Sequence, residues 1–467
     1  MTESLAMKKP TRAILYALMF GPFFSMFDSG LVNVGLPVIA RDFGASMQAV
    51  QWTAAVYLLA MSALLPIFGS LADAWGRGRI YNLGFFTISI FTLLCGFAPN
   101  LPVLIAFRAL QAVGGAMVMA NGMAIATESY PAAERGRNIG LLASMMAIGS
   151  IAGPSIGGIV IGFWGWRAAF YCTFGVSIVA FATTFFAIPR NRKSEASPHR
   201  FDIMGSLLLV LSIFAFVYGF SSLGGKSASE LLALIALALF AIAFPLLLAV
   251  ERRKPRPVLD LGLFRNVTFS SSLVASLISF ATMYSPTILV PFYLQGTLHL
   301  SPQISGLYLL AFPLAMAILS PLSGRLSDRV GSRPLAVAAL IINSMALICF
   351  GLIGPGAPKW LILGPLFAMG IGLGLFQSPN NSAAMGSAPK EKLGAANGII
   401  QLVKNLGMVI GITFSTMAFT SLMGDRLIGD ATAFLGSARL VYWGAAALSL
   451  FGAYVASLRS KEKAVTT

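Results

Sequence analysis

The chain carries one carboxylate inside a long apolar segment, in the stretch Phe27-Asp28-Ser29-Gly30-Leu31-Val32-Asn33-Val34-Gly35-Leu36-Pro37. The apolar segment begins after Arg12 and reaches Pro37, which is long enough for a helix to cross a hydrocarbon core of roughly 30 Å. At about 1.5 Å per residue, Asp28 lies about 23 Å along that helix, beyond the bilayer centre. An ionisable group at this depth is costly, so Asp28 is a candidate functional residue.

The composition places the whole chain in a membrane. Of its 467 residues, 57% are hydrophobic and 10% are charged, with a mean hydropathy of +0.82. Soluble domains carry roughly 25% charged residues, so we expect an all-α polytopic membrane protein. The net charge of +16 comes from short loops between apolar spans, which argues against nucleic-acid binding. No pattern of catalytic nucleophile and base occurs and the three cysteines lack metal-ligand spacing, so neither an enzyme nor a bound metal or cofactor is expected.

Hydropathy predicts fourteen transmembrane helices in groups of six, two and six. The first six spans are near 13–36, 49–72, 80–98, 101–127, 138–163 and 168–188, and two more are near 203–222 and 230–250. The last six are near 267–296, 304–323, 335–354, 360–386, 395–420 and 437–458. These groups predict an N-terminal bundle over 1–190, a linker with two helices over 191–265 and a C-terminal bundle over 266–467.

The distribution of basic residues predicts the orientation. With the N-terminus in the cytoplasm, 24 of the 32 Lys and Arg residues fall in inside segments and six in outside segments. The remaining two, Arg108 and Lys404, lie within spans. By the positive-inside rule, both termini are therefore expected in the cytoplasm.

A short loop pattern occurs twice, each time after the second span of a group of six. The first copy has Gly69, Asp73, Gly76 and Arg77, and the second has Gly324, Asp328, Arg329 and Gly331. A single copy is better explained as a tight turn that sets topology. Two copies at matched positions indicate repeated halves whose loop charges pair in one arrangement and separate in another.

The fifth span contains a glycine pattern with one proline. Gly149, Gly153 and Gly157 recur every four residues on one helix face, which allows a neighbouring backbone to approach closely. Pro154 lacks a backbone donor and favours a kink. Glycine spacing alone is ordinary helix packing, but the whole string with its proline is more specific.

These motifs together resemble those of the major facilitator superfamily, in particular its fourteen-span drug:proton antiporter branch. The two loop copies are similar to the family's loop motif, residues 149–158 to its antiporter motif, and residues 28–37 to the first-helix signature of that branch. Leu104, Arg108, Gln111 and Gly114 follow its fourth-helix motif. The resemblance implies two six-helix bundles around a central cavity, alternating access by rocking of the bundles, and two extra helices that join them.

Depth arithmetic adds a specific hypothesis about Asp28 and Arg108. Arg108 lies roughly 11 Å below the outer end of its span and Asp28 roughly 7 to 10 Å below the same face. If their helices adjoin, approach of Arg108 favours the charged form of Asp28 and withdrawal favours its protonation. We therefore expect Asp28 to carry the proton and Arg108 to adjust the proton affinity of Asp28. The alternative is a static buried ion pair that holds the two helices together. Lys404 is either a second gating charge or a residue whose side chain reaches to the membrane surface.

Aromatic and amide residues are the candidate substrate contacts. They are Phe24, Phe27 and Asn33 in the first span, Phe280 and Tyr284 in the seventh span counted over the two bundles, and Gln377, Asn380 and Asn381 in the tenth. A cavity lined by such groups suits bulky amphipathic molecules. Each aromatic residue is individually more often packed core or lipid-facing, whereas an amide without a partner in hydrocarbon is expensive.

The sequence thus predicts a monomeric antiporter of a bacterial inner membrane. It would export hydrophobic, amphipathic or cationic compounds against proton entry, with lipids, substrate and protons as its only partners and the proton gradient in place of a cofactor. Two alternatives stay open: a dedicated exporter of one endogenous lipid, sugar or metabolite, and a transporter-like sensor that moves no solute.

Overall fold

The computed structural model describes residues 12–130, 132–188, 203–222, 227–254, 260–389, 392–424, 426 and 428–459. Throughout these ranges the regular structure is helical. Apolar runs supply the helices, and short polar residues set several of their starts: Asn100, Ser301 and Asp430 each accept a hydrogen bond from a backbone N–H in the first turn.

The first bundle is formed by α1 to α6. Its helices are α1 (Arg12–Asp42), α2 (Met47–Val50), α3 (Trp52–Trp75), α4 (Arg77–Gly96), α5 (Leu101–Ser129) and α6 (Ala132–Ala187). The first half of α6 packs along α1, and α5 packs against both α3 and α4. Gly165, at φ 81°, interrupts the helical backbone of α6.

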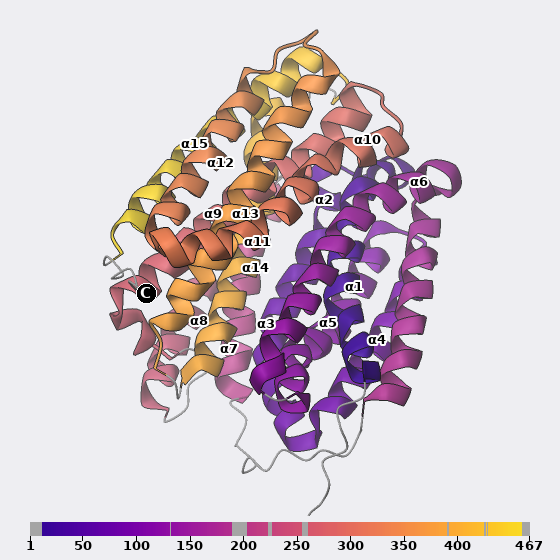
Figure 1. Cartoon of the computed structure of the whole chain (residues 1–467). Coiled ribbons are helices and arrows are strands. Elements are labelled where there is room, and N and C mark those ends of the chain that lie inside the picture. The colour runs from indigo at the N-terminus through magenta and orange to yellow at the C-terminus, as the bar shows by residue number, and fades with distance from the viewer. Residues whose placement is uncertain are drawn as a thin grey trace, which may run out of the picture.

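The second bundle is formed by the elements from η1 to α15. They are η1 (Leu263–Arg265), α9 (Val267–Phe292), the π-helical η2 (Tyr293–Thr297), α10 (Pro302–Leu309), α11 (Ala311–Val330), α12 (Ser332–Leu352), η3 (Lys359–Ile362), α13 (Leu363–Gly386), α14 (Leu393–Met423) and α15 (Ala431–Ser457). Figure 1 shows this bundle beside the first, with α10 next to α6 at one end of the molecule.

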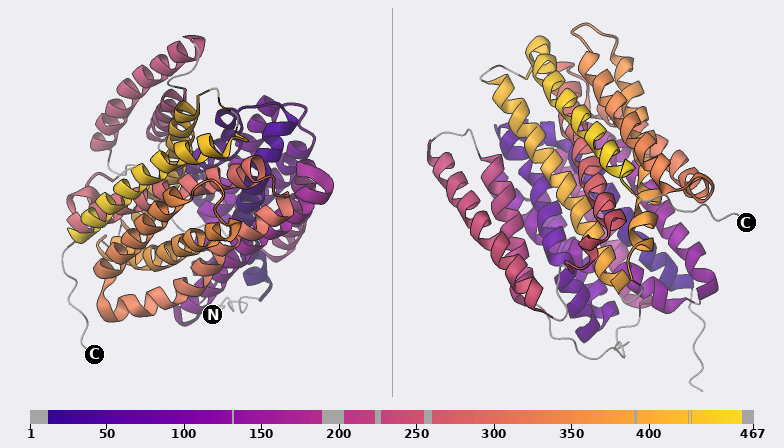
Figure 2. Two further views of the ribbon diagram at one scale, coloured as in Figure 1. Left: turned by 90° about the horizontal axis from the view of Figure 1, so that it is seen from above. Right: turned by 90° about the vertical axis from the view of Figure 1, so that its left-hand side faces the viewer.

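Two helices connect the bundles in sequence and lie on one flank of the molecule (Figure 2). They are α7 (Ile203–Ser221) and α8 (Ser227–Arg253). Helix α7 packs against α3 of the first bundle and α14 of the second, with Tyr218 near Trp52 and Phe220 near Phe414. Helix α8 packs mainly on α7 and leaves much apolar surface exposed, as expected for a helix surrounded by lipid.

Twelve helices among the described residues are long and apolar enough to cross a membrane. One of them, Gly140–Ala187, covers all but the outermost residues of both predicted spans 138–163 and 168–188, and its 48 residues would extend about 72 Å if straight. The predicted span 203–222 forms α7, whose apolar part Met204–Phe220 is shorter than the others. The chain is therefore a multi-pass membrane protein, and the count of fourteen crossings stays a prediction.

The two copies of the loop motif have the same backbone turn. Gly76 follows α3 at φ 97° and donates its N–H to the Ala72 carbonyl at 2.8 Å. Gly331 follows α11 at φ 85° and donates to the Ser327 carbonyl at 2.9 Å. A positive φ favours glycine, which explains why both copies have this residue at the same point.

Candidate functional site

Asp28 and Arg108 form a buried ion pair at the centre of the first bundle. Nη1 of Arg108 lies 2.8 Å from Oδ2 of Asp28, which joins α5 to α1. The exposed fraction is 0% for Asp28 and 1% for Arg108. The predicted contact between the two residues is therefore present, and its role in proton coupling stays a prediction.

Four further residues complete a network around this pair. Gln111, one turn after Arg108, accepts from Arg108 through Oε1 and donates through Nε2 to Oδ1 of Asp28 at 3.3 Å and to Oγ1 of Thr92 at 2.7 Å. Arg108 also donates from Nε to the Thr53 carbonyl at 3.0 Å, and its guanidinium lies 4.4 Å from the ring centroid of Tyr57. The network therefore links α1, α3, α4 and α5.

Sequence reasoning identified Asp28 and Arg108 because they are charged, and Gln111 through its motif. It missed Thr53, Tyr57 and Thr92, because a single hydroxyl in an apolar span gives no periodic or charge signal. All three are buried. Thr53 accepts from Arg108 through its backbone carbonyl, Thr92 accepts from Gln111 through its hydroxyl, and Tyr57 offers its ring face to the guanidinium. Polar groups left unpaired in hydrocarbon would be costly.

Removing only the cation of this pair is expected to destabilise the protein strongly. In Arg108→Met, the Asp28 carboxylate remains buried without a counter-ion, and breaking a buried pair this way costs roughly 3–5 kcal/mol. We expect a clear fall in the midpoint of thermal unfolding of the detergent-purified protein. The double variant Asp28→Asn/Arg108→Met, which removes both charges, should recover part of this loss.

Arg167→Met is the matched control for this prediction. Arg167 pairs with Asp42 at 2.7 Å, but the two side chains are 41% and 45% exposed. An exposed pair contributes about 0–1 kcal/mol, so this variant should unfold close to the wild-type midpoint. A wild-type midpoint for Arg108→Met would contradict a structural dependence of Asp28 on Arg108.

A second group of residues lies between the two bundles, close to the first network. The side chain of Tyr284 of α9 lies next to that of Ser29, the residue after Asp28. Tyr284 and Met408 of α14 both pack against two apolar clusters, each of which combines residues of both bundles and one of which contains Tyr57. The Lys404 ammonium, one turn before Met408, lies 5.7 Å from the ring centroid of Phe280. We call Ser29, Tyr57, Phe280, Tyr284, Lys404 and Met408 the bundle-interface cluster.

The antiporter-motif residues lie where three helices meet. A Cβ on Gly149, Gly153 or Gly157 would collide with the backbone of α1, at 2.7 Å from the Phe27 carbonyl oxygen in the case of Gly153. On the adjacent face of α6, the Pro154 carbonyl and Gly158 lie against Gly306 of α10, in the other bundle. The glycines therefore permit close packing of α6 on α1 and, one face away, of the first bundle on the second.

The loop-motif charges differ between the two copies. Arg77 pairs with Glu128 at the end of α5, at 2.6 Å. Gly69 lies in α3, and so does Asp73, but the Asp73 side chain is outside the described part of the structure. Asp328 and Arg329 are exposed at the end of α11 and form no ion pair with the described residues. Pairing and release of these charges stays a prediction.

The candidate substrate residues of α1 point in different directions. Phe24 packs on Phe85 of α4, and Phe27 stacks on Phe23 in a cluster with residues of α6. Both are buried against helices of their own bundle. Asn33 lies one turn above Ser29 and is partly buried, on the face that approaches α9. Of these three, Asn33 has the position that best suits contact with a substrate between the bundles.

The amides of α13 are also not equivalent. Asn380 is buried, donates to the Ser272 carbonyl at 3.2 Å and to Oγ of Ser276 at 2.8 Å, and accepts from Arg459. These bonds hold α13 to α9 and to Arg459, which lies two residues beyond the end of α15. Gln377 and Asn381 are partly buried, and the buried Oδ1 of Asn381 has no partner among the described residues. Substrate contact by these amides stays a prediction. The Asn380 side chain already forms hydrogen bonds that hold helices together.

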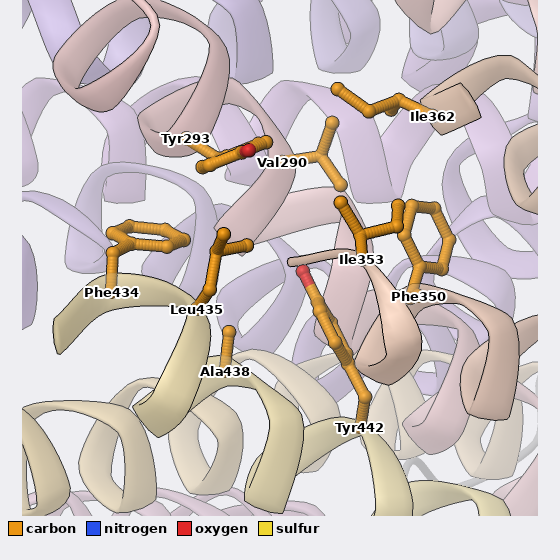
Figure 3. A pocket seen from close by; sticks show the side chains of 9 residues that line it. All are labelled: Val290, Tyr293, Phe350, Ile353, Ile362, Phe434, Leu435, Ala438 and Tyr442. Atoms are coloured by element: carbon orange, nitrogen blue, oxygen red, sulfur yellow. The ribbon is translucent and has the colours of Figure 1, made fainter. Parts of the chain in front are cut away.

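A small cavity lies within the second bundle and is lined by residues of α9, η2, α12, η3 and α15 together with Ile353 (Figure 3). Its volume is about 10 Å³, which is room for one water molecule. Its lining is almost entirely apolar, and Tyr293 and Tyr442 supply its only hydroxyl groups. This cavity is too small to be a substrate site.

The geometry above agrees with the comparison to known sequences. A sequence profile of the Major Facilitator Superfamily matches residues 18–412. The chain belongs to the major facilitator superfamily. This membership confirms the broader resemblance inferred from the motifs and indicates a transporter rather than an enzyme.

Relatives within the superfamily carry different transport names. The riboflavin transporter RibZ of Clostridioides difficile is 30% identical over 442 residues, covering 94% of this chain and 95% of that protein. The multidrug resistance protein Stp of Mycobacterium tuberculosis is 31% identical, covering 85% of this chain and 74% of the relative. The multidrug transporter protein MdtP of Bacillus subtilis is 27% identical, and the match covers 92% of this chain and 79% of the relative.

Solved structures of other transporters share the fold. A bacterial homologue of the human lysosomal transporter Spinster, in an inward-facing and unoccupied conformation, matches with a TM-score of 0.71 at 16% identity, covering 97% of each chain. The peptide transporter POT in complex with alafosfalin matches with a TM-score of 0.69 at 15% identity, covering 94% of this chain and 93% of that one. At these identities the likeness concerns the fold alone.

Proposed function

We propose that this protein is a proton-driven antiporter of the drug:proton branch, which exports hydrophobic or amphipathic compounds by alternating access. The observation that carries the proposal is the Asp28–Arg108 pair, a carboxylate and a guanidinium fully buried in the first bundle and joined at 2.8 Å. Charged groups at this depth are expensive and usually serve transport or proton transfer.

The surroundings of Asp28 suit a residue that changes charge with conformation. A bonded guanidinium favours the carboxylate, and its withdrawal favours protonation. Asp28 is next to Ser29, whose side chain lies beside Tyr284 of the other bundle. Movement of the bundles therefore acts directly on the helix turn that carries the carboxylate. This arrangement supports coupling over a purely static pair.

The dedicated export of one metabolite is the second candidate function. The observation that favours it is the similarity to a riboflavin transporter over nearly the full length of both chains. The multidrug names of other relatives favour a broad substrate range instead. The two functions share the same fold and proton site and differ in substrate range.

The proposal includes the membrane topology. Division of α6 at Gly165 and inclusion of α7 would give fourteen crossings, with α7 and α8 as the central pair. Both termini would then lie on the cytoplasmic side of a bacterial inner membrane, as the basic loops favour. The proposal also takes the protein to act as a monomer.

The function is tested with the purified wild-type protein in liposomes that contain a lumenal pH dye. Lipophilic cations, neutral drugs, lipophilic anions and riboflavin are added one at a time. We expect several compounds to trigger a change of lumenal pH that protein-free liposomes do not show. A response to riboflavin alone would favour the dedicated exporter. If no compound moves protons after insertion is verified, broad drug efflux is excluded, and export of a single native solute or a sensing role becomes the better explanation.

A further inference from the structure

Lys404 is a buried cation for which the described structure offers no counter-ion. Only 5% of the residue is exposed. The hydrogen bonds and ion pairs of the described residues do not include it, and its ammonium lies instead over the Phe280 ring. One of the two sequence-based explanations required the long side chain to reach the membrane surface. In this structure the Lys404 side chain is buried and does not do so.

The buried carboxylate of Asp28 is already hydrogen-bonded to other residues. Asp28 accepts hydrogen bonds from Arg108 and Gln111. In the second bundle, the described carboxylates are Asp260, Asp328 and Asp430, and all three lie at helix ends. Among the described residues, Asp28 is thus paired with Arg108, whereas no carboxylate pairs with the buried Lys404. An unpaired buried cation is unfavourable unless another anion approaches.

The neighbours of Lys404 are those of a binding surface for an aromatic molecule. Phe280 and Tyr284 are one turn apart on α9 and present their rings on one face. Met408 is one turn after Lys404 on α14, and its thioether adapts to flat rings. Tyr284 and Met408 touch apolar clusters of both bundles, so separation of the bundles would uncover this group.

We propose that Lys404 binds the anionic group of an amphipathic aromatic substrate, whose ring system lies against Phe280, Tyr284 and Met408. This inference rests on the proposed export function, since it assumes that substrate passes between the bundles. It narrows the substrate class from amphipathic compounds in general to aromatic sulfonates and carboxylates. A cationic aromatic compound of the same shape would be repelled by the same ammonium.

Two probes with one ring system test the charge preference of the detergent-purified full chain. They are 1-pyrenesulfonate, which is anionic at any working pH, and a pyrenylmethyl trimethylammonium salt, which is cationic. Fluorescence titration should give a Kd for the sulfonate at least about tenfold lower than that for the ammonium probe. In Lys404→Gln, the sulfonate Kd should rise at least about tenfold while the ammonium Kd does not rise.

Lys404→Arg and Lys392→Gln are the matched variants. Arginine keeps the positive charge, so sulfonate binding should change by no more than about threefold. Lys392 lies at the start of the same helix, paired with Asp260 at 2.6 Å, and its replacement should leave both Kd values unchanged. If Lys404→Gln does not fold, the probe preference of the wild type and of Lys404→Arg still decides the question.

Three results would overturn the inference: no preference of the wild type for the sulfonate, an unchanged sulfonate Kd in Lys404→Gln, or equal weakening of both probes in Lys404→Gln. The last would indicate a packing role. Proton movement in liposomes separates this inference from the antiport proposal. Sulfonate binding through Lys404 without proton movement would refute the antiport proposal but not the role of Lys404. Proton movement driven by cations without sulfonate binding would refute the role of Lys404 but not the antiport proposal.

Discussion

Asp28→Asn is expected to reduce substrate-triggered proton movement in liposomes to the level of protein-free vesicles. The amide has the size and shape of the carboxyl group but cannot take up a proton at this site, so the coupled step is lost. The variant should still fold. The oxygen of the introduced amide can accept from Arg108, and Arg108 keeps the Gln111 side chain, the Thr53 carbonyl and the Tyr57 ring as partners.

Asp42→Asn is the matched control for that experiment. Asp42 is the last residue of the same helix, and its side chain is 45% exposed beside Arg167. Removal of this carboxylate should leave proton movement within about twofold of the wild type, because an exposed pair contributes little. Proton coupling that survives in Asp28→Asn would exclude Asp28 as the proton carrier, whatever the control shows.

Gly158→Val is expected to lower transport at least about tenfold while leaving each bundle folded. A Cβ at Gly158 would lie 2.6 Å from the Pro302 carbonyl oxygen and 3.2 Å from the Cα of Gly306. Both neighbours are backbone atoms of the other bundle, so they cannot move aside as a side chain would. The valine should therefore force the bundles apart at α6 and α10 and disfavour the arrangement described here.

Thiol labelling measures this separation directly. The Gln295 side chain donates from η2 to the Val34 carbonyl at 2.9 Å, across the same interface. In a background without native cysteines, Gln295→Cys should be protected from a membrane-impermeant thiol reagent and become labelled when Gly158→Val is added. Gly140→Val on the same helix is the control, because its Cβ would meet no atom within 4 Å. Unchanged transport and labelling in Gly158→Val would show that the interface tolerates the added volume.

The contact between Asp28 and Arg108 was predictable because helix geometry fixes depth. A constant rise per residue gives the height of each side chain in its span from its position alone. The resemblance then supplied the missing information that the first and fourth spans are neighbours. The glycine positions of α6 were predictable for a similar reason, since a four-residue spacing defines one face of a helix.

Direction around the helix axis was much harder to predict. Phe24 and Phe27 are at suitable positions along α1, but their rings face α4 and α6, because apolar runs on all sides of a membrane helix hide which face is inward. Asn380 is an amide in an apolar span, as a substrate contact would be, and here it bonds Arg459 and two serines of α9. Pairing partners from distant spans cannot be assigned from one sequence.

The position of α7 has a consequence for the speed of the transport cycle. Its aromatic residues touch Trp52 of α3 on one side and Phe414 of α14 on the other. Any change in the angle between the bundles must slide at least one of these ring contacts. Because α8 rests on α7 and faces lipid, such sliding also displaces acyl chains at that flank. In the proposed alternating-access cycle, a more viscous membrane is therefore expected to slow the change between the two arrangements of the bundles through α7 and α8. The energy for that change would still come from the proton gradient.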